Sequence, residues 1–167
     1  SNSAAYNPPT GLTADRWYQR EVSSCGDSDT TATVKVTVNG ALTPGSIGTA
    51  HTVCNNGDPS TLTSTSGAGG GDASYVYEWF WSANGTTGWT AIASSNSAAY
   101  NPPTGLTADR WYQREVSSCG DSDTTATVKV TVNGALTPGS IGTAHTVCNN
   151  GDPSTLTSTS GAGGGDA

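Results

Sequence analysis

Alternating apolar residues, dense turn signals and a long internal repeat predict an all-β fold, an immunoglobulin-like Greek-key β-sandwich repeated in tandem. In residues 127–132 every second residue is a valine, which is the pattern of a strand with one buried face. Asn-Gly and Pro-containing clusters separate such segments at short intervals, as in sandwiches. Residues 1–73 and 95–167 are identical, so the period is 94 residues, the length of a whole domain.

One aromatic segment, residues 75–81, predicts the core strand of the sandwich. It contains the only Phe, two of the five Trp and two of the six Tyr. Tyr77, Trp79 and Trp81 fall on one face of an extended chain, and Phe80 falls on the other. Large aromatic side chains on both faces favour a central strand. The block of residues 74–94 that contains this segment occurs once, whereas the remainder of the chain occurs twice.

The valine-rich strand and the turn after it set the expected domain boundaries. Asn133-Gly134 follows residues 127–132, and its twin is Asn39-Gly40. We therefore expect residues 1–41 to be the C-terminal part of a preceding repeat, 42–135 a complete repeat, and 136–167 the N-terminal part of a following repeat. Identical units offer no diversity of sites, so the array is expected to supply length, multivalency or both.

Seven strands are expected within the complete repeat, with residues 67–71 as a flexible glycine-rich loop. Leu106 precedes Tyr112 by six residues, a spacing typical of a tyrosine corner. Arg114 then shares the inner face with Tyr112 and Val116, so we expect it to extend to the sheet edge or to pair with Glu78. The expected strands are residues 46–53, 60–64, 75–81, 89–92, 98–100, 110–118 and 124–132.

Composition and charge exclude several classes of function. The formal net charge is −7 with only six Lys and Arg residues, which argues against nucleic acid as a partner. No apolar run approaches the ~20 residues of a membrane span. His51 is the only His of the repeat, and no Ser/His/Asp or Cys/His spacing forms around it. We therefore predict that the protein is not an enzyme.

Two cysteines per repeat, in turns and without CxxC spacing, favour an extracellular disulfide over zinc. Immunoglobulin topology places Cys54 and Cys119 at opposite ends of the sandwich, roughly 30 Å apart. A disulfide needs Cα atoms about 4.4–6.8 Å apart, so we expect pairing between neighbouring repeats. The same expectation holds for Cys25 and Cys148, and free thiols are the alternative.

The turn carboxylates are expected to be solvated, so no cofactor is predicted. Asp58, Asp121 and Asp123 are the candidate ligands, although the segment after Cys119 lacks the glycine and terminal Glu of a twelve-residue calcium loop. Calcium bound by these residues at the junction between domains is the alternative.

Several motifs spread over the repeat resemble one known family. They are Gly45-Ser46-Ile47-Gly48, Thr52-Val53-Cys54-Asn55-Asn56-Gly57-Asp58-Pro59, Tyr77-Glu78-Trp79, Leu106-Thr107, Trp111-Tyr112-Gln113-Arg114 and Thr127-Val128-Lys129-Val130-Thr131-Val132. The sequence resembles the tandem immunoglobulin-like repeats of large SprB-like cell-surface adhesins of gliding Bacteroidota. The resemblance implies an extracellular location at the cell surface, a very long filament, and attachment to a substratum or to surface polysaccharide.

Two functions therefore follow as expectations. The first is a structural and adhesive repeat that acts as a spacer in a surface filament and in multivalent attachment during gliding. The second is a carbohydrate-binding module, with Trp89 and Trp111 as candidate sugar-stacking residues. Solvent accessibility of those two rings discriminates between the two functions, because stacking on a sugar needs an exposed ring face.

Overall fold

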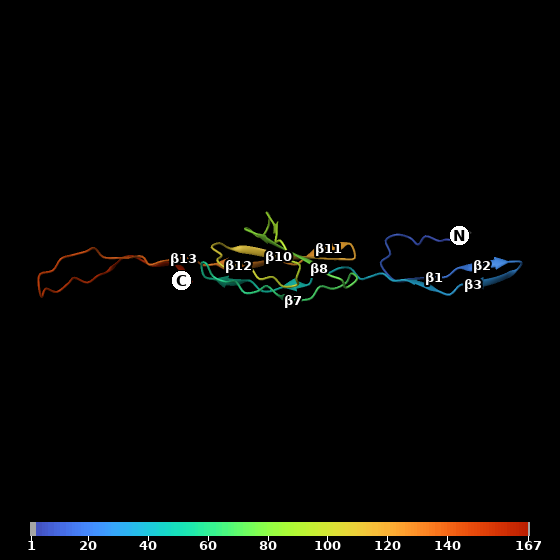
Figure 1. Cartoon of the computed structure of the whole chain (residues 1–167), viewed down its shortest axis with the longest axis horizontal. Helices are drawn as coiled ribbons and strands as arrows, with labels where there is room; N and C mark the ends of the chain where they lie inside the picture. The colour runs from blue at the N-terminus through green and yellow to red at the C-terminus, as the bar shows by residue number, and fades with distance from the viewer. Residues whose placement is uncertain (1–2, 167) are drawn as a thin grey trace.

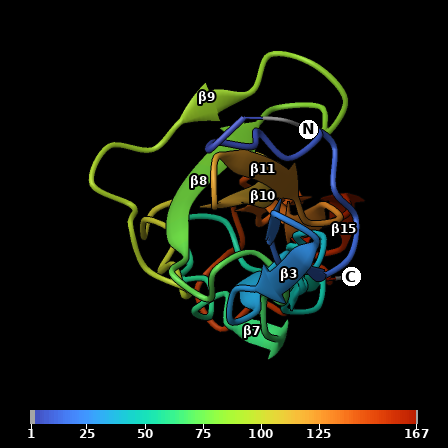
Figure 2. The same cartoon turned by 90° about the vertical axis from the view of Figure 1, so that its right-hand side faces the viewer.

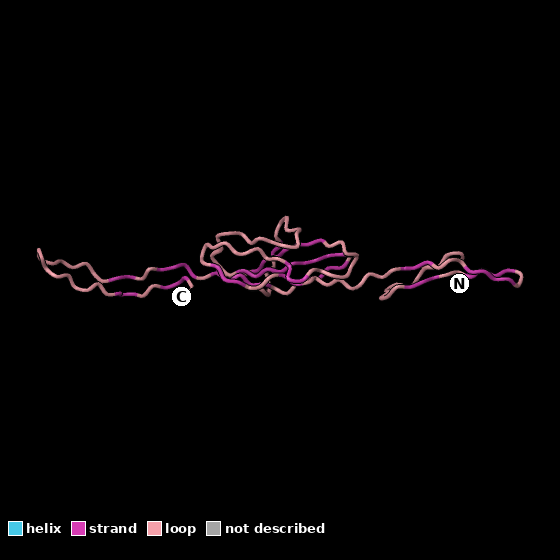
Figure 3. Tube along the Cα trace, turned by 90° about the horizontal axis from the view of Figure 1, so that it is seen from below, coloured by secondary structure: helices cyan, strands magenta, loops and turns pink. Residues whose placement is uncertain are grey.

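The computed structural model describes residues 3–166, which form strands and loops without a helix. A central domain lies between two extended arms that leave it in opposite directions (Figures 1 and 3). Residues 1, 2 and 167, which belong to the predicted terminal parts, lie outside the described range. The all-β class predicted from the sequence is confirmed.

One layer of the central domain is a six-stranded sheet. Its order is β6-β12-β10-β8-β9, and β11 pairs with the second half of β10. β6 runs parallel to β12, whereas the other pairs are antiparallel. The strands are β6 (His51–Val53), β8 (Val76–Ser82), β9 (Thr90–Ala91), β10 (Arg110–Ser118), β11 (Asp121–Thr124) and β12 (Val128–Val132).

The opposite layer is smaller. β5 (Ser46–Ile47) pairs antiparallel with β7 (Ser64–Ser66), and a single bridge joins Leu62 to Tyr100. In the end-on view β7 lies on the side of the domain away from β8 and β10 (Figure 2). Two layers with a buried core between them form a sandwich, as the sequence predicts.

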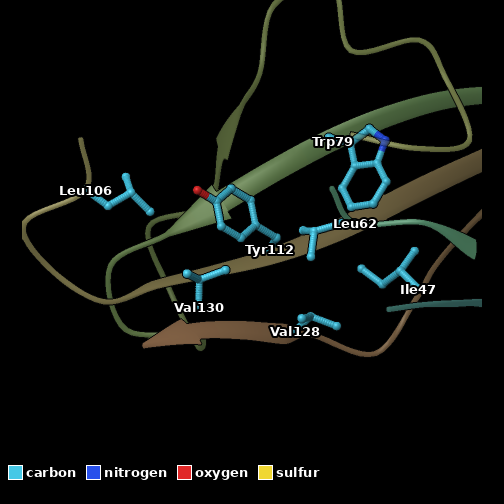
Figure 4. Close-up of a cluster of buried hydrophobic side chains, with 7 residues drawn as sticks. All are labelled: Ile47, Leu62, Trp79, Leu106, Tyr112, Val128 and Val130. Atoms are coloured by element: carbon cyan, nitrogen blue, oxygen red, sulfur yellow. The ribbon is translucent and has the colours of Figure 1, made fainter. Parts of the chain in front are cut away.

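Apolar side chains from both layers meet in one core (Figure 4). Trp79 of β8 and Tyr112 of β10 are fully buried, and Val128 and Val130 of β12 point to the same side. Full burial of an apolar side chain of this size contributes about 1.5–3 kcal/mol each. The buried cluster is Ile47, Leu62, Trp79, Leu106, Tyr112, Val128 and Val130.

The aromatic segment is confirmed as a strand, but it is not the central one. Arg114 lies opposite Trp79 and Tyr112 lies opposite Trp81 in the β8–β10 register. β10 pairs with three strands, β8, β11 and β12, whereas only the two-residue β9 lies beyond β8. The centre of the sheet is therefore β10, which is the longest strand among residues 3–166.

Several predicted strands are shorter or divided. The predicted strand 46–53 is divided between the two layers: Gly48 donates its N–H to Thr63 and so continues the β5–β7 pairing, whereas residues 51–53 join the six-stranded sheet as β6. The predicted strand 124–132 begins only at Val128, because Thr125 instead hydrogen-bonds to Arg114. Residues 121–124 turn back along β10 after a tight Cys119-Gly120 turn in which both residues have positive φ, 57° and 85°, the turn geometry that fits a two-residue hairpin.

The two arms consist of two-stranded ribbons. In the N-terminal arm β1 pairs with β4 and β2 pairs with β3. In the C-terminal arm β13 pairs with β16 and β14 pairs with β15. Their bounds are β1 (Arg16–Tyr18), β2 (Glu21–Ser24), β3 (Asp27–Thr30), β4 (Val34–Val36), β13 (Gly134–Thr137), β14 (Ser140–Ile141), β15 (Ser158–Ser160) and β16 (Gly163–Gly165).

Candidate functional site

The best-defined local structure outside the core is the junction at which one repeat continues into the next. At the N-terminal junction the linker lies on the glycine-rich segment of the following domain. Gly71 donates its N–H to the carbonyl of Gly40 at 2.9 Å, and Thr43 and Gly69 exchange two backbone hydrogen bonds at 2.9 and 3.0 Å. The linker is thus held by backbone hydrogen bonds, which resemble a short added strand.

Glycine is required where the two backbones approach. Gly70 has a φ of +73°, and a Cβ atom there would lie 1.9 Å from the carbonyl oxygen of Ala41. No side chain fits at that distance, and the positive φ also disfavours other residues. The prediction of a flexible loop at residues 67–71 is therefore wrong, because Gly69, Gly70 and Gly71 hold the linker. We call these three glycines the seat of the linker.

The C-terminal junction repeats the same arrangement. Gly134 pairs with Gly165 and Thr137 pairs with Gly163. A Cβ atom at Gly164 would lie 2.0 Å from the carbonyl oxygen of Ala135. Two junctions with the same geometry indicate that this seat is a property of the repeat.

The cysteines lie at the two ends of the central domain. Cys54 follows Val53, which is in register with Val132 at the end of β12. Cys119 follows the far end of β10, whose first residue, Arg110, pairs with Val130. About nine residues of β10 at ~3.3 Å each separate the two ends. All four cysteines are exposed and free, so the expected pairing between repeats stays a prediction.

Both cysteines lie beside the linkers. The Asn39 side chain donates from Nδ2 to the Cys119 sulfur at 3.6 Å. Asn133, which is the counterpart of Asn39, donates its N–H to the carbonyl of Val53 at 2.9 Å. Each end of the domain thus brings one cysteine next to the same linker asparagine.

The central domain also matches a known family. The family described as "Domain of unknown function (DUF8696)" matches residues 43–134, which is more than half of the chain. The chain belongs to the DUF8696 family. No curated protein and no solved structure matches the chain. The matched range lies inside the predicted complete repeat, 42–135, whose exact limits stay a prediction.

The carboxylates of the DUF8696 domain that are candidate calcium ligands are divided between its ends. Asp58 follows the turn after Cys54, whereas Asp121 and Asp123 belong to β11. Among residues 3–166 no group of three or more His, Cys, Asp or Glu side chains is arranged to hold a metal ion. A calcium site that uses all three carboxylates would therefore have to form between neighbouring domains, with Asp58 from one domain and the counterparts of Asp121 and Asp123 from the next.

The two candidate sugar-stacking rings of the DUF8696 domain are half-buried. Trp111 packs against the Gly85 backbone, because a Cβ at Gly85 would lie 2.5–2.8 Å from its ring atoms. The Lys129 ammonium lies 5.0 Å from the centroid of the same ring. Trp89 is also partly covered. Neither ring is wholly exposed or wholly buried, so the accessibility test does not decide between the two expected functions.

Arg114 is a residue whose role the sequence did not reveal. It is fully buried and, among residues 3–166, forms an ion pair with no carboxylate, so both the sheet-edge and the Glu78 predictions are wrong. Its guanidinium donates to the Pro44 and Ala98 carbonyls at 2.9 and 2.6 Å and to the Ser64 hydroxyl at 2.6 Å. Burial lowers the pKa of this guanidinium, and Tyr77 partly opposes that effect. Arg114 thus connects the two layers.

Tyr112 is buried as expected for a tyrosine corner, but its hydroxyl has no hydrogen-bond partner among the described residues.

His51 accepts the Ser60 N–H at Nε2, so it stabilises the turn of residues 54–59. No helix among the described residues is both long and apolar enough to cross a membrane.

Proposed function

We propose that the DUF8696 repeat is a structural and adhesive unit of a long bacterial cell-surface filament. It acts as a spacer and makes multivalent contacts with a substratum or with surface polysaccharide during gliding. Its first partners are the neighbouring repeats of the same chain. The observation that supports this proposal most is the seat of the linker, which is built in the same way at both junctions.

Because the seat fixes the linker, each added repeat extends the array along its long axis. Because residues 40–43 are hydrogen-bonded to residues 69–71, the linker is fixed on the next domain rather than free to swing. The arms extend the long axis of the central domain in both directions (Figure 1). Repeats joined in this way add their lengths, and weak contacts made by many copies add their affinities.

The cysteines would stiffen the same joint. We propose that Cys54 pairs with the counterpart of Cys119 in the following repeat. The two thiols lose two protons and two electrons to a disulfide-bearing oxidant of the export route, which becomes a dithiol. An open pocket of about 340 Å³ beside Cys119, lined in part by Ser74 and Val76, leaves room for the neighbouring turn. Residues 1–167 contain only one of the two partners at each junction.

Arrays of two, three and four complete repeats test the spacer proposal by small-angle X-ray scattering. We expect the maximum dimension to increase by a constant step per repeat. In the control array, Gly70→Val in every repeat blocks the seat, so the increase per repeat should fall. Growth with only the square root of the repeat number, as for a flexible chain, would contradict the proposal.

The adhesive and covalent parts need separate measurements. Adhesion predicts that retention on a polysaccharide-coated surface rises steeply with repeat number, and equal retention of one and four repeats would refute multivalent contact. Disulfide mapping of oxidised three-repeat arrays should yield a peptide pair that joins Cys54 to the next Cys119 counterpart. A Cys54–Cys119 bond within one repeat would contradict both the pairing and the register.

A further inference from the structure

We infer that the outer face of the six-stranded sheet binds a polysaccharide that carries free amino groups, such as a polymer of glucosamine. This inference rests on the adhesive part of the proposed function, for which it names the surface and the class of ligand. The outer face is the side of β8, β10 and β12 that points away from β7 (Figure 2). All of these strands lie within the range that matches the DUF8696 family.

Strand alternation places two aromatic side chains on the outer face. Trp79 and Tyr112 face the core, so their chain neighbours Phe80 and Trp111 point outwards. Phe80 lies opposite Gln113 in the β8–β10 register, and Trp111 is two residues from Gln113 along β10. Both outward rings are only partly covered. Diagonal neighbours of this kind are about 7–8 Å apart, so the two rings form a platform on which successive sugar rings can stack.

The Trp111 ring is held in position on this platform. Gly85 lies against it, and the ammonium of Lys129, which forms an ion pair with Asp109, is 5.0 Å from the ring centroid. The loop that contains Gly85 is itself fixed, because the Ser82 hydroxyl accepts the Gly85 N–H at 3.1 Å. A ring that is already ordered loses little freedom when a ligand binds.

Two carboxylates lie side by side on the same face. Glu78 and Glu115 are directly opposite each other in the β8–β10 register, which places their Cβ atoms about 4.5–5.5 Å apart. Among residues 3–166 neither forms an ion pair. Like charges directly opposite each other destabilise a sheet, so both carboxylates would attract a cationic group of a ligand.

No basic side chain of the domain neutralises this pair. Residues 43–134 contain three Lys and Arg residues, Arg110, Arg114 and Lys129. Arg114 is buried in the core, Arg110 lies over an aromatic ring of the inner face, and Lys129 is paired with Asp109 at 2.6 Å. The complementary charge is therefore left to the ligand.

The rings and the carboxylates adjoin each other and together select one class of ligand. Phe80 and Gln113 are each two residues, about 6.6 Å, from Glu78 and Glu115 along their strands. A sugar stacked on Phe80 thus has both carboxylates beside it, and the Gln113 amide can donate to and accept from its hydroxyl groups. The net charge of −7 repels acidic polysaccharides. An amino sugar combines the flat ring, the hydroxyl groups and the positive charge that these side chains fit.

The test is calorimetric titration of the 167-residue chain with the hexamer of glucosamine, in mildly acidic buffer that keeps its amino groups charged. The fully N-acetylated hexamer has the same rings without the charge, and hexalysine has the charge without the rings. The glucosamine hexamer should bind at least about tenfold more tightly than either, and its affinity should fall as salt is added. Equal binding of either comparison ligand, or no binding of the glucosamine hexamer, would overturn the inference.

Variants locate the binding on the outer face. Glu78→Gln combined with Glu115→Gln should lower the affinity about tenfold or more, whereas the urea midpoint should not fall, because the like-charge contact is relieved. Phe80→Leu keeps an apolar side chain but removes the ring, and it should also weaken binding. Glu21→Gln changes the twin of Glu115, which has Thr30 opposite it, and should bind like the wild type. An unchanged affinity in the double variant, or an equal loss in Glu21→Gln, would contradict the assignment.

The titration and the surface-retention measurement have separate outcomes. Tight binding of the glucosamine hexamer, without an increase of retention with repeat number, would support the amino-sugar site and contradict multivalent adhesion. Retention that rises with repeat number but is unchanged by Glu78→Gln with Glu115→Gln would support adhesion and overturn the amino-sugar site.

Discussion

The same amino-acid sequence occurs in two environments in this chain, and the comparison separates local from long-range causes of structure. Val128 is 7% exposed in the central domain, but its twin Val34 is 65% exposed in the N-terminal arm. Val116 and Val22 differ in the same direction. Identical residues with identical propensities thus become core or surface according to whether the remainder of a repeat is present.

The hairpins form in both environments. The β2–β3 register, with Glu21 opposite Thr30, reproduces the β10–β11 register, with Glu115 opposite Thr124. The β5–β7 pairing is likewise repeated by β14–β15. Pairings between the two halves of a repeat are lost: residues 145–147 form no strand without a β12 partner, whereas residues 51–53 are β6. Local pairing therefore follows from the segment itself, and the core requires residues 74–94 and both flanking halves.

The largest effect is expected from replacing Trp79, the core residue that neither arm contains. Trp79→Ala should lower the free energy of unfolding of the central domain by about 3–5 kcal/mol, because it empties the space of a fully buried ring. Urea unfolding followed by the fluorescence of the remaining Trp residues measures it. Val76→Ala, on the exposed face of the same strand, is the control, and equal losses in the two variants would show that β8 does not organise the core.

A second pair of variants tests the comparison directly, because the same residue is changed in each environment. Leu62→Ala should cost about 2–4 kcal/mol, since Leu62 is fully buried. Leu156→Ala, in the exposed twin, should leave unfolding of the central domain unchanged within about 0.5 kcal/mol. The same urea titration measures both, and a comparable loss from Leu156→Ala would mean that the arm shares in the core.

The sequence was sufficient where the pattern is local. Alternation placed Val128, Val130 and Tyr112 on the buried face, and the predicted strand 110–118 coincides with β10. It was not sufficient where a residue is determined by a distant partner. Arg114 was assigned to the sheet edge because its acceptors, at Pro44, Ser64 and Ala98, lie in segments whose placement no alternation reveals.

The candidate site shows the same limit. Glycine-rich composition indicates a flexible loop when read alone, but Gly70 has no space for a side chain because the linker backbone at Ala41 lies against it. Both segments recur with the 94-residue period, as residues 134–137 and 163–165. Their pairing could not be derived, because backbone hydrogen bonds leave no mark on side-chain pattern.

A third, smaller effect is expected at the buried cation. Arg114→Ala should cost about 2 kcal/mol, because it leaves the partly buried acceptors unsatisfied while relieving the desolvation of a charge. Arg20→Ala changes the exposed twin, whose guanidinium donates to the Ala4 carbonyl, and should have no measurable effect on the central domain. The difference in urea midpoint between the two variants is the readout, and the absence of a difference would show that Arg114 does not connect the layers.

The smallest expected effect is pH-dependent and concerns the carboxylate that holds the last strand. Hydrogen bonds from Lys129 and from the Val132 N–H lower the pKa of Asp109 below its ordinary value in the folded domain. A lowered folded pKa means that Asp109 stabilises the domain above about pH 4, the pKa of an unfolded carboxyl, and that this stability is lost as the pH falls through the folded pKa. Asp109→Asn should therefore lower the free energy of unfolding by under about 1 kcal/mol at neutral pH, as for exposed ion pairs. In acid the difference in stability between the variant and the wild type should decrease.

The control is Asp15→Asn. Asp15 is the N-terminal twin of Asp109 and has the counterparts of the same two partners, so this substitution should leave the central domain unaffected at every pH. Urea midpoints between pH 2 and pH 7 decide the matter, because a wild type and an Asp109→Asn variant with parallel pH profiles would show that the strand end is held by packing and not by this charge.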